Sequence, residues 1–252
     1  MQKLINELKE TPIKPNPDFS IQDYLENKHY YHQQVICCLP VLKDNPWHKE
    51  NLGYCADFGL LFRNYYFGAA NLTAEKAIKQ HLSRQVCLRT SILRDLQLID
   101  EQLKSTGLRF LILSGYRHPD LQRYILREAA RQKGAEFANK MLANPDFYAP
   151  HATGAALDLE IWDEKNKMVL PTKINGSIGR LGLEEKSSQT LAEQEVRANR
   201  RLIHNLLTTD CLLPKERVFV GHPFEYWHYG RHERLSAFFA GLTQPIYYDV
   251  VL

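Results

Sequence analysis

The stretch PHATGAALDLEIW, residues 150–162, sets the centre of the fold. Residues 155–162 have the length and the apolar content of a β-strand. The polar run DEKN at 163–166 is typical of a turn, and residues 167–170 are predicted to form a second strand. The sequence therefore predicts two joined strands at this point of the chain.

His151 and Asp158 flank the small residues at 152–156. In an extended strand their separation would span roughly 23 Å, and on a helix roughly 10 Å. Both distances are too long for two ligands of one metal ion, so these side chains can share a metal only if the chain folds back between them. Small residues at 152–156 permit that bend. The alternative is an ordinary strand entry with His151 as a surface histidine.

A second segment, EYWH at residues 225–228, supplies another carboxylate and another imidazole. Hydrolytic zinc sites use three nitrogen or oxygen ligands and keep a fourth position for water. A separate carboxylate then takes the proton of that water. His151, Asp158, Glu225 and His228 offer this set of groups, and they can meet only in the folded chain. We hypothesise a metal-dependent hydrolytic site.

Arg117 follows a short apolar run at 108–113, which predicts a strand, and precedes a predicted helix at 120–132. An arginine in such a turn can direct a planar fork of donors into a cleft. In a zinc hydrolase it would stabilise the developing oxyanion or hold a substrate carboxylate. The alternative is a salt bridge that ties the turn to the helix.

Other side chains compete for these roles. His222 and Glu225 form a His-x-x-Glu pair, which is a possible rival ligand pair. Glu160 would share a strand face with Asp158, either as a rival ligand or as a carboxylate that supports the ligands. Three further histidines are expected to be caps or surface groups: His118, His204 and His232.

The wider pattern mixes helices and strands without a regular βαβ order, which favours the α+β class. Periodic apolar residues predict helices from Thr90 to Leu103 and over residues 191–208. Prolines within residues 1–20 predict an extended arm. Further strands are expected at 35–42, 217–221, 225–230 and 245–251, and a loop at 176–188.

The composition indicates a soluble globular protein. The chain has 252 residues, a formal net charge of +3, 44% hydrophobic residues and 24% charged residues. These values argue against disorder, collagen and coiled coil, and they require neither nucleic acid nor an anionic membrane as partner. Five cysteines without a Cys-x-x-Cys motif are expected to be buried thiols in a reducing compartment. Residues 1–16 lack the apolar segment of a signal peptide, so a cytoplasmic location is expected.

The motifs together resemble a known family. His-x-x-Gly-x-x-x-Asp, then Glu-x-x-His, with Gly-Tyr-Arg-x-Pro upstream, is similar to the zinc D-alanyl-D-alanine dipeptidases of the vancomycin-resistance type. These enzymes belong to the wider D,D-peptidase and hedgehog-type fold. The resemblance covers roughly residues 85 to 232, and the order and combined spacing of the motifs make it specific.

The resemblance implies a role for each site residue. His151, Asp158 and His228 would bind one zinc ion per chain, Glu225 would be the general base, and Arg117 would stabilise the tetrahedral intermediate. It also implies an α+β single domain, with a small, mostly antiparallel sheet flanked by helices and the zinc site in a cleft at the sheet. Residues 1–85 would form an arm that wraps the peptidase core at 86–252.

The expected partner is a small zwitterionic dipeptide, D-Ala-D-Ala or a close relative, with neither nucleic acid nor membrane as partner. The oligomeric state is left open. Departures from the family pattern at Ala149, at Cys211-Leu212 and at residues 170–175 spare the expected ligands but fall on the expected pocket walls. Two alternatives therefore stay open: a D,D- or L,D-carboxypeptidase of cell-wall peptides, and a zinc-binding domain without turnover.

Overall fold

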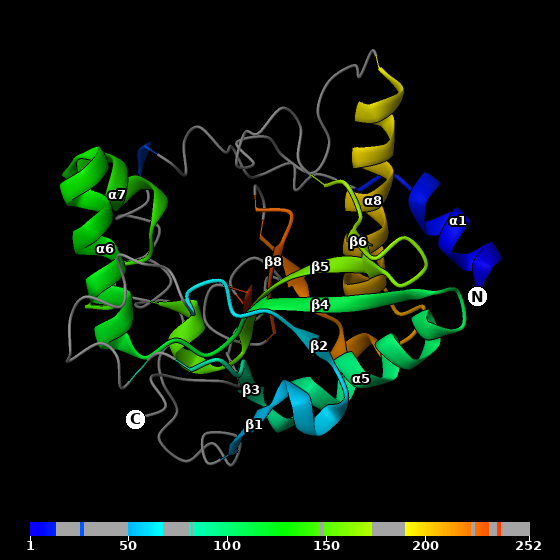
Figure 1. Cartoon of the computed structure of the whole chain (residues 1–252), viewed down its shortest axis with the longest axis horizontal. Helices are drawn as coiled ribbons and strands as arrows, with labels where there is room; N and C mark the ends of the chain where they lie inside the picture. Colours follow the sequence, from blue (N-terminus) through cyan, green and yellow to red (C-terminus); the bar gives the residue numbers. More distant parts are fainter. Residues whose placement is uncertain are drawn as a thin grey trace.

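The protein is described by a computed structural model (Figure 1). The described residues are 1–13, 26–27, 50–67, 81, 83–146, 149–172, 190–222, 225–231 and 236–237. The strands predicted at 35–42 and 245–251 and the loop predicted at 176–188 lie outside these residues.

A small mixed sheet forms the centre of the described structure. Its strands are β2 Leu61–Phe62, β4 Leu108–Ser114, β5 Ala156–Asp163, β6 Met168–Val169, β7 Val220–Gly221 and β8 His228–Gly230. The order is β2-β4-β5-β8-β7, and β6 pairs with the C-terminal end of β5. The β2–β4 pair is parallel and the other pairs are antiparallel. A separate ribbon pairs β1 Leu52–Tyr54 with β3 Cys87–Arg89.

Helices flank this sheet, which confirms the α+β class. The α-helices are α1 Gln2–Glu10, α5 Thr90–Lys104, α6 Pro119–Lys133, α7 Ala135–Met141 and α8 Leu191–Thr208. Short 3₁₀ helices occur at η2 Cys55–Phe58, η3 Pro150–Thr153 and η4 Lys215–Arg217. Within the described residues, no helix is both long enough and apolar enough to cross a membrane.

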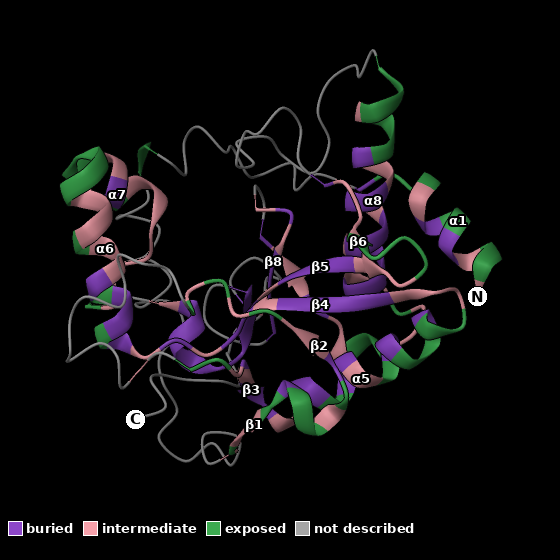
Figure 2. Cartoon of the chain, viewed as in Figure 1, coloured by how far each residue is buried: buried purple, intermediate pink, exposed green. Residues whose placement is uncertain are grey.

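The hydrophobic core lies between the sheet and helices α1, α5 and α8 (Figure 2). Strand β4 contributes Phe110 and Ile112, and β5 contributes Leu157, Leu159 and Ile161. All five side chains are fully buried. Because side chains alternate between the two faces of a strand, the intervening residues of β5 project from the opposite face. The core contacts therefore leave the residues on the opposite face of β5 available for a functional site.

The prediction of an extended arm over residues 1–20 is wrong for its first half, where the chain forms α1. Ile5 and Leu8 lie one helical turn apart and are buried in the core. The side-chain amide of Asn205, from α8, donates to the carbonyls of Leu8 at 2.8 Å and Thr11 at 3.0 Å. These bonds satisfy carbonyls at the end of α1, so contacts with α8 explain the helix. The division of the chain at residues 85 and 86 stays a prediction.

Two other predicted boundaries differ from the structure, and one helix was not predicted. Residues 215–217 form η4, and the strand predicted at 217–221 is reduced to β7. The strand predicted at 225–230 begins only at His228, because the backbone N–H of His228 donates to the carbonyl of Glu225 at 2.9 Å and closes a turn. Gly134, with φ of 92°, ends α6 as expected, but a further helix, α7, follows it directly.

Candidate functional site

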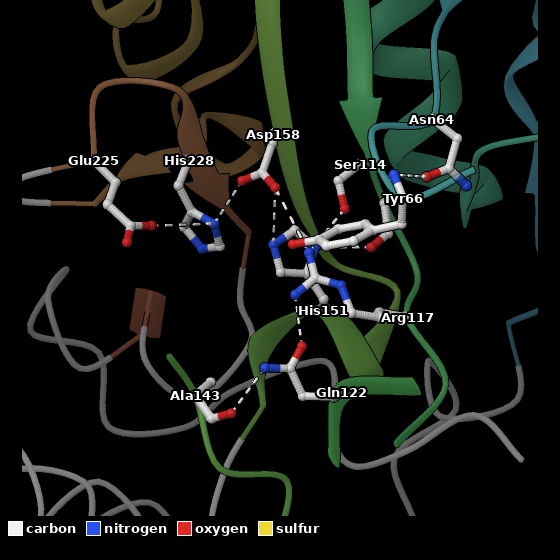
Figure 3. Close-up of polar contacts among 11 residues, drawn as sticks. Asn64, Tyr66, Ser114, Arg117, Gln122, Ala143, His151, Asp158, Glu225 and His228 are labelled. Atoms are coloured by element: carbon white, nitrogen blue, oxygen red, sulfur yellow. Dashed lines mark hydrogen bonds and ion pairs between the residues drawn. The ribbon is translucent and has the colours of Figure 1, made fainter. Parts of the chain in front are cut away.

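Three strands place three polar residues in one row across the face of the sheet opposite the core (Figure 3). The register pairs Ser114 of β4 with Asp158 of β5, and Asp158 with His228 of β8. Directly paired residues on neighbouring strands project from the same face. Backbone pairing alone therefore brings Asp158 and His228 together, although they are far apart in sequence.

His151 reaches the same point by the bend that the sequence predicts. Helix η3 ends at Gly154, whose φ of 70° suits glycine, and a Cβ there would lie 2.6 Å from Leu52 Cδ2. The Thr153 hydroxyl donates to the carbonyl of Pro150 at 2.6 Å, which tightens the turn. The chain thus folds back and points the His151 ring at the sheet.

The three side chains offer a coherent set of metal ligands. His151 Nδ1–H donates to the carbonyl of Gly115 at 2.8 Å, which leaves His151 Nε2 free to face Asp158 Oδ2 at 3.4 Å. His228 Nδ1 lies 3.0 Å from Asp158 Oδ1. One ligand atom from each of the three residues lies within 4.8 Å of the others. Two imidazole nitrogens and a carboxylate oxygen fit a zinc-type donor set.

The electrostatics of the cluster suit metal binding. Burial lowers the pKa of His151 to about 4, more than the nearby Asp158 carboxylate raises it, so the ring is neutral at pH 7. Burial alone would raise the pKa of Asp158, but charge and hydrogen-bond interactions with His151 and His228 outweigh it and hold the pKa well below its usual range. Burial also opposes protonation of His228, yet its pKa is raised by Asp158 and by Glu225. The neutral His151 imidazole and the ionised Asp158 carboxylate are the forms that bind metal, whereas His228 binds a metal only when its ring has lost its extra proton.

Glu225 lies beside the cluster without belonging to it. Its Oε2 is 3.9 Å from His228 Nδ1, and its side chain is 24% exposed. The turn that precedes β8 holds it there. Figure 3 shows the carboxylate on the side of His228 that faces away from Arg117. A carboxylate in this position can exchange a proton with a group held at the three ligands.

Arg117 approaches the cluster from the opposite side (Figure 3). Its Nη2 lies 3.8 Å from Asp158 Oδ2 and donates to the Ser114 hydroxyl at 3.0 Å. Its Nη1 donates to Gln122 Oε1 at 2.6 Å. The Gln122 amide donates in turn to the carbonyl of Ala143 at 2.8 Å. The guanidinium is therefore held in one orientation. The alternative role, a salt bridge between the turn and the helix, does not account for the approach of Arg117 to Asp158.

Two residues at the site, Gln122 and Tyr66, were missed by the sequence reasoning. Gln122 is buried near the start of α6. The sequence offered one signal for it, an amide side chain five residues after Arg117. Tyr66 lies with its ring centroid 4.3 Å from Arg117 Cζ. Burial raises the pKa of Tyr66, against the opposing effect of Arg117. Its hydroxyl is therefore protonated at neutral pH.

The rival ligands are placed outside the cluster. Glu160 accepts a hydrogen bond from the Thr172 hydroxyl at 2.8 Å and another from the Tyr226 hydroxyl at 3.4 Å. His222 packs edge-on against His228, with ring centroids 5.4 Å apart. His118 caps α6, because its Nδ1 accepts from the backbone N–H of Asp120, as expected. His204 lies 6.2 Å from the Tyr229 ring, between centroids, and His232 is outside the described residues.

A second group, His81, His118 and Asp120, also brings possible ligand atoms together. The two imidazole rings are stacked, with centroids 3.7 Å apart and planes within 7° of parallel. Lone pairs of parallel rings point side by side rather than at one ion, and His118 Nδ1 already accepts the Asp120 backbone N–H. This group is therefore a stacked pair beside a helix cap.

Gly115→Ala is expected to lower both stability and metal affinity. An added Cβ would lie 2.3 Å from the carbonyl oxygen of Cys87, so the backbone that orients His151 must shift. Overpacking of this kind costs about 1–3 kcal/mol. Thermal unfolding and zinc titration measure the two effects. Gly59→Ala is the control: a φ of +65° strains the added Cβ, so stability should fall there too, but nothing lies within 4 Å of that Cβ and zinc affinity should hold. Unchanged zinc affinity in Gly115→Ala would contradict the role of this turn.

The comparisons with known proteins agree with this geometry. Residues 85–229, more than half of the chain, match the family model described as VanY, D-alanyl-D-alanine carboxypeptidase. The chain therefore belongs to this family, which confirms the resemblance drawn from the motifs. No curated protein sequence matches the chain.

Three solved structures illustrate the similarity. The LdcB LD-carboxypeptidase is 20% identical over 63% of this chain and 71% of its own, with a TM-score of 0.36. The D,D-dipeptidase VanXYg, in complex with a D-Ala-D-Ala phosphinate analogue, is 18% identical over 77% and 72%, with a TM-score of 0.35. A mutant of the D,D-pentapeptidase VanY in complex with Zn(II) is 19% identical over 64% and 84%, with a TM-score of 0.36. The family assignment rests on the sequence match.

Proposed function

We propose that this protein is a zinc-dependent D,D-peptidase that hydrolyses the bond between two D-alanines. One observation carries the proposal: His151, Asp158 and His228 converge, with Glu225 on one side and Arg117 on the other. Zinc, when bound, supplies an acidified water and a Lewis acid. Membership of the VanY family supports the same chemistry.

The chain's own residues divide the remaining work. Glu225 takes a proton from the attacking water and later gives it to the leaving amine, as the carbon–nitrogen bond breaks. Arg117 stabilises the negative charge that develops on the carbonyl oxygen. The tethers to Gln122 and Ser114 hold the guanidinium before substrate binds, so little reorganisation is needed during the reaction. A structural zinc domain has no use for such a base and such a donor.

The free dipeptide is our first candidate substrate. A cavity of about 310 Å³ adjoins Arg117, with Ser114, Tyr66 and Asn64 also in its wall. Among the described residues, its lining includes none of the three ligands and not Glu225, so the cavity is one part of a substrate site. Its volume, at the lower end of the roughly 300–1,000 Å³ of ligand pockets, suits a small group of a substrate. The description of the family favours the second candidate, carboxypeptidase action on a longer cell-wall peptide.

The test is zinc-restored hydrolysis. Purified protein is stripped with a chelator, reloaded with zinc, and assayed on D-Ala-D-Ala and on a muropeptide ending in the same two residues. We expect hydrolysis that disappears with the chelator and returns with zinc. Faster release of D-alanine from the muropeptide would select the carboxypeptidase. A folded protein that binds zinc without cleaving either substrate would contradict the proposal.

Arg117→Lys is expected to lower kcat on the order of 10²-fold without changing zinc content. Lysine keeps the charge but loses the planar fork that bonds Gln122 and Ser114 together. Steady-state kinetics and metal analysis of the same preparation measure both. The control is Arg123→Lys, an exposed arginine of α6 that pairs with Asp120 and Asp146. Loss of zinc in Arg117→Lys would instead make Arg117 a support of the ligands.

We also place the protein in a reducing compartment, the cytoplasm. Cys55, Cys87 and Cys211 are free thiols. Burial raises the pKa of Cys87 to about 11, with a further contribution from Asp57, so its thiol stays protonated. Exported proteins commonly pair such cysteines. Fractionation of cells that make the protein tests this location, and recovery from the culture medium would contradict it.

A further inference from the structure

Tyr66 is fixed in place by the strand pairing that precedes it. After β2, the backbone N–H groups of Arg63 and Tyr65 continue to donate to β4, at the carbonyls of Ile112 and Leu113, both at 2.9 Å. The backbone N–H of Tyr66 then donates to Asn64 Oδ1 at 3.1 Å, which forms a turn. Because β2 and β4 run parallel, this turn ends beside the segment that carries Arg117.

The Tyr66 ring is held between two surfaces. Arg117 lies against one face, with Cζ 4.3 Å from the ring centroid. The ring also packs against the buried cluster formed by Leu121 and Tyr124 of α6. These contacts hold the ring in place.

The hydroxyl points at the metal-ligand cluster. Figure 3 shows the Tyr66 ring lying along Arg117, with the oxygen directed towards Asp158 and His151. The charges of Arg117, Asp158 and Glu225 all act on this hydroxyl, which supports the placement. Among the described residues, the Tyr66 hydroxyl has no hydrogen-bond partner. A directed donor without a partner, inside a site built from charged groups, is available to a ligand.

We propose that Tyr66 is a catalytic residue that donates a hydrogen bond to the substrate carbonyl oxygen as it becomes an oxyanion. Arg117 supplies the charge and Tyr66 a second, neutral donor from the same side of the site. No bond to Tyr66 forms or breaks, and its proton stays on the phenol oxygen. This inference rests on the proposed peptidase function and adds a residue to it.

A merely structural role would give a different result. If Tyr66 only covered Arg117, the ring would be sufficient and the hydroxyl dispensable. Tyr66→Phe keeps the ring, its packing and its stacking on Arg117, and removes only the oxygen. The matched control is Tyr65→Phe, because Tyr65 is the neighbouring tyrosine and is 70% exposed.

The experiment compares wild type, Tyr66→Phe and Tyr65→Phe as zinc-loaded full-length proteins. We expect Tyr66→Phe to lower kcat on the order of 10²-fold, with KM, zinc content and melting temperature close to wild type. Tyr65→Phe should match wild type throughout. A Tyr66→Phe variant within about twofold of the wild-type kcat would overturn the inference.

A second measurement separates transition-state binding from general damage. A phosphinate analogue of D-Ala-D-Ala carries a tetrahedral, anionic centre, whereas the dipeptide itself does not. Tyr66→Phe should raise the inhibition constant of the phosphinate far more than the KM of the dipeptide, both measured by steady-state kinetics. Equal increases in both would overturn the inference. A wild-type protein that cleaves neither the dipeptide nor the muropeptide and does not bind the phosphinate would instead overturn the proposed function, and the inference with it.

Discussion

Glu225→Gln is expected to lower kcat for D-Ala-D-Ala hydrolysis by about 10²–10⁴-fold while zinc stays bound. The substitution keeps the size and shape of the side chain but removes the carboxylate that accepts the proton of the attacking water. Zinc should stay because Glu225 is outside the group formed by His151, Asp158 and His228. Quantification of product in samples quenched at fixed times gives kcat, and metal analysis of the same preparation gives the zinc content.

The control for this variant is Glu101→Gln, an exposed position on α5 away from the site. It should match wild type in kcat and in zinc content. Loss of zinc from Glu225→Gln would show that Glu225 is a ligand. Full activity with zinc retained would show that another group accepts the proton.

Asp158→Asn is expected to abolish both zinc binding and turnover. The amide has one weak oxygen donor in place of the ionised carboxylate that faces both His151 and His228. Loss of groups that only support metal ligands costs about 10–100-fold in affinity, so loss of a ligand should cost more than about 100-fold. Competition against a chromophoric chelator gives the zinc affinity.

Glu160→Gln is the matched control, because Glu160 is the other carboxylate on the same face of β5. Its carboxylate accepts hydrogen bonds from Thr172 and Tyr226, and it does not belong to the group of possible ligands formed by His151, Asp158 and His228. Zinc affinity in this variant should stay near that of wild type. A large loss there, with Asp158→Asn unaffected, would exchange the roles of the two carboxylates.

Elements with strong local signals could be predicted from the sequence. Helix α8 was expected at 191–208, and the structure has the same bounds. Its start is fixed locally, since Thr190 and Glu193 form a reciprocal capping box. Gly134 likewise ends α6 where the sequence indicates. Helix α1 could not be predicted, because its support comes from α8, almost two hundred residues away.

The candidate site likewise contains residues that the sequence could identify and one that depends on distant contacts. Motif spacing identified the five residues that converge, because their chemistry is distinctive even when their positions are distant. It could not identify Tyr66, since the position of that side chain depends on a parallel pairing between β2 and β4 that no local pattern encodes. Aromatic residues near Tyr66 were visible in the sequence, but only the register of the sheet separates it from the exposed Tyr65.

The origin of the three ligands has a kinetic consequence. Asp158 and His228 belong to paired strands, whereas His151 is carried by η3, a single turn. All four residues of η3 are buried, and the carbonyls of Thr153 and Gly154 accept hydrogen bonds from Arg89, so the turn can open only when these contacts break. A metal held here would exchange with solution through a swing of the turn at 150–154, with the sheet intact. Its residence time would then follow the rate at which that turn opens, so changes that stiffen the turn would slow metal loss without altering the global unfolding rate.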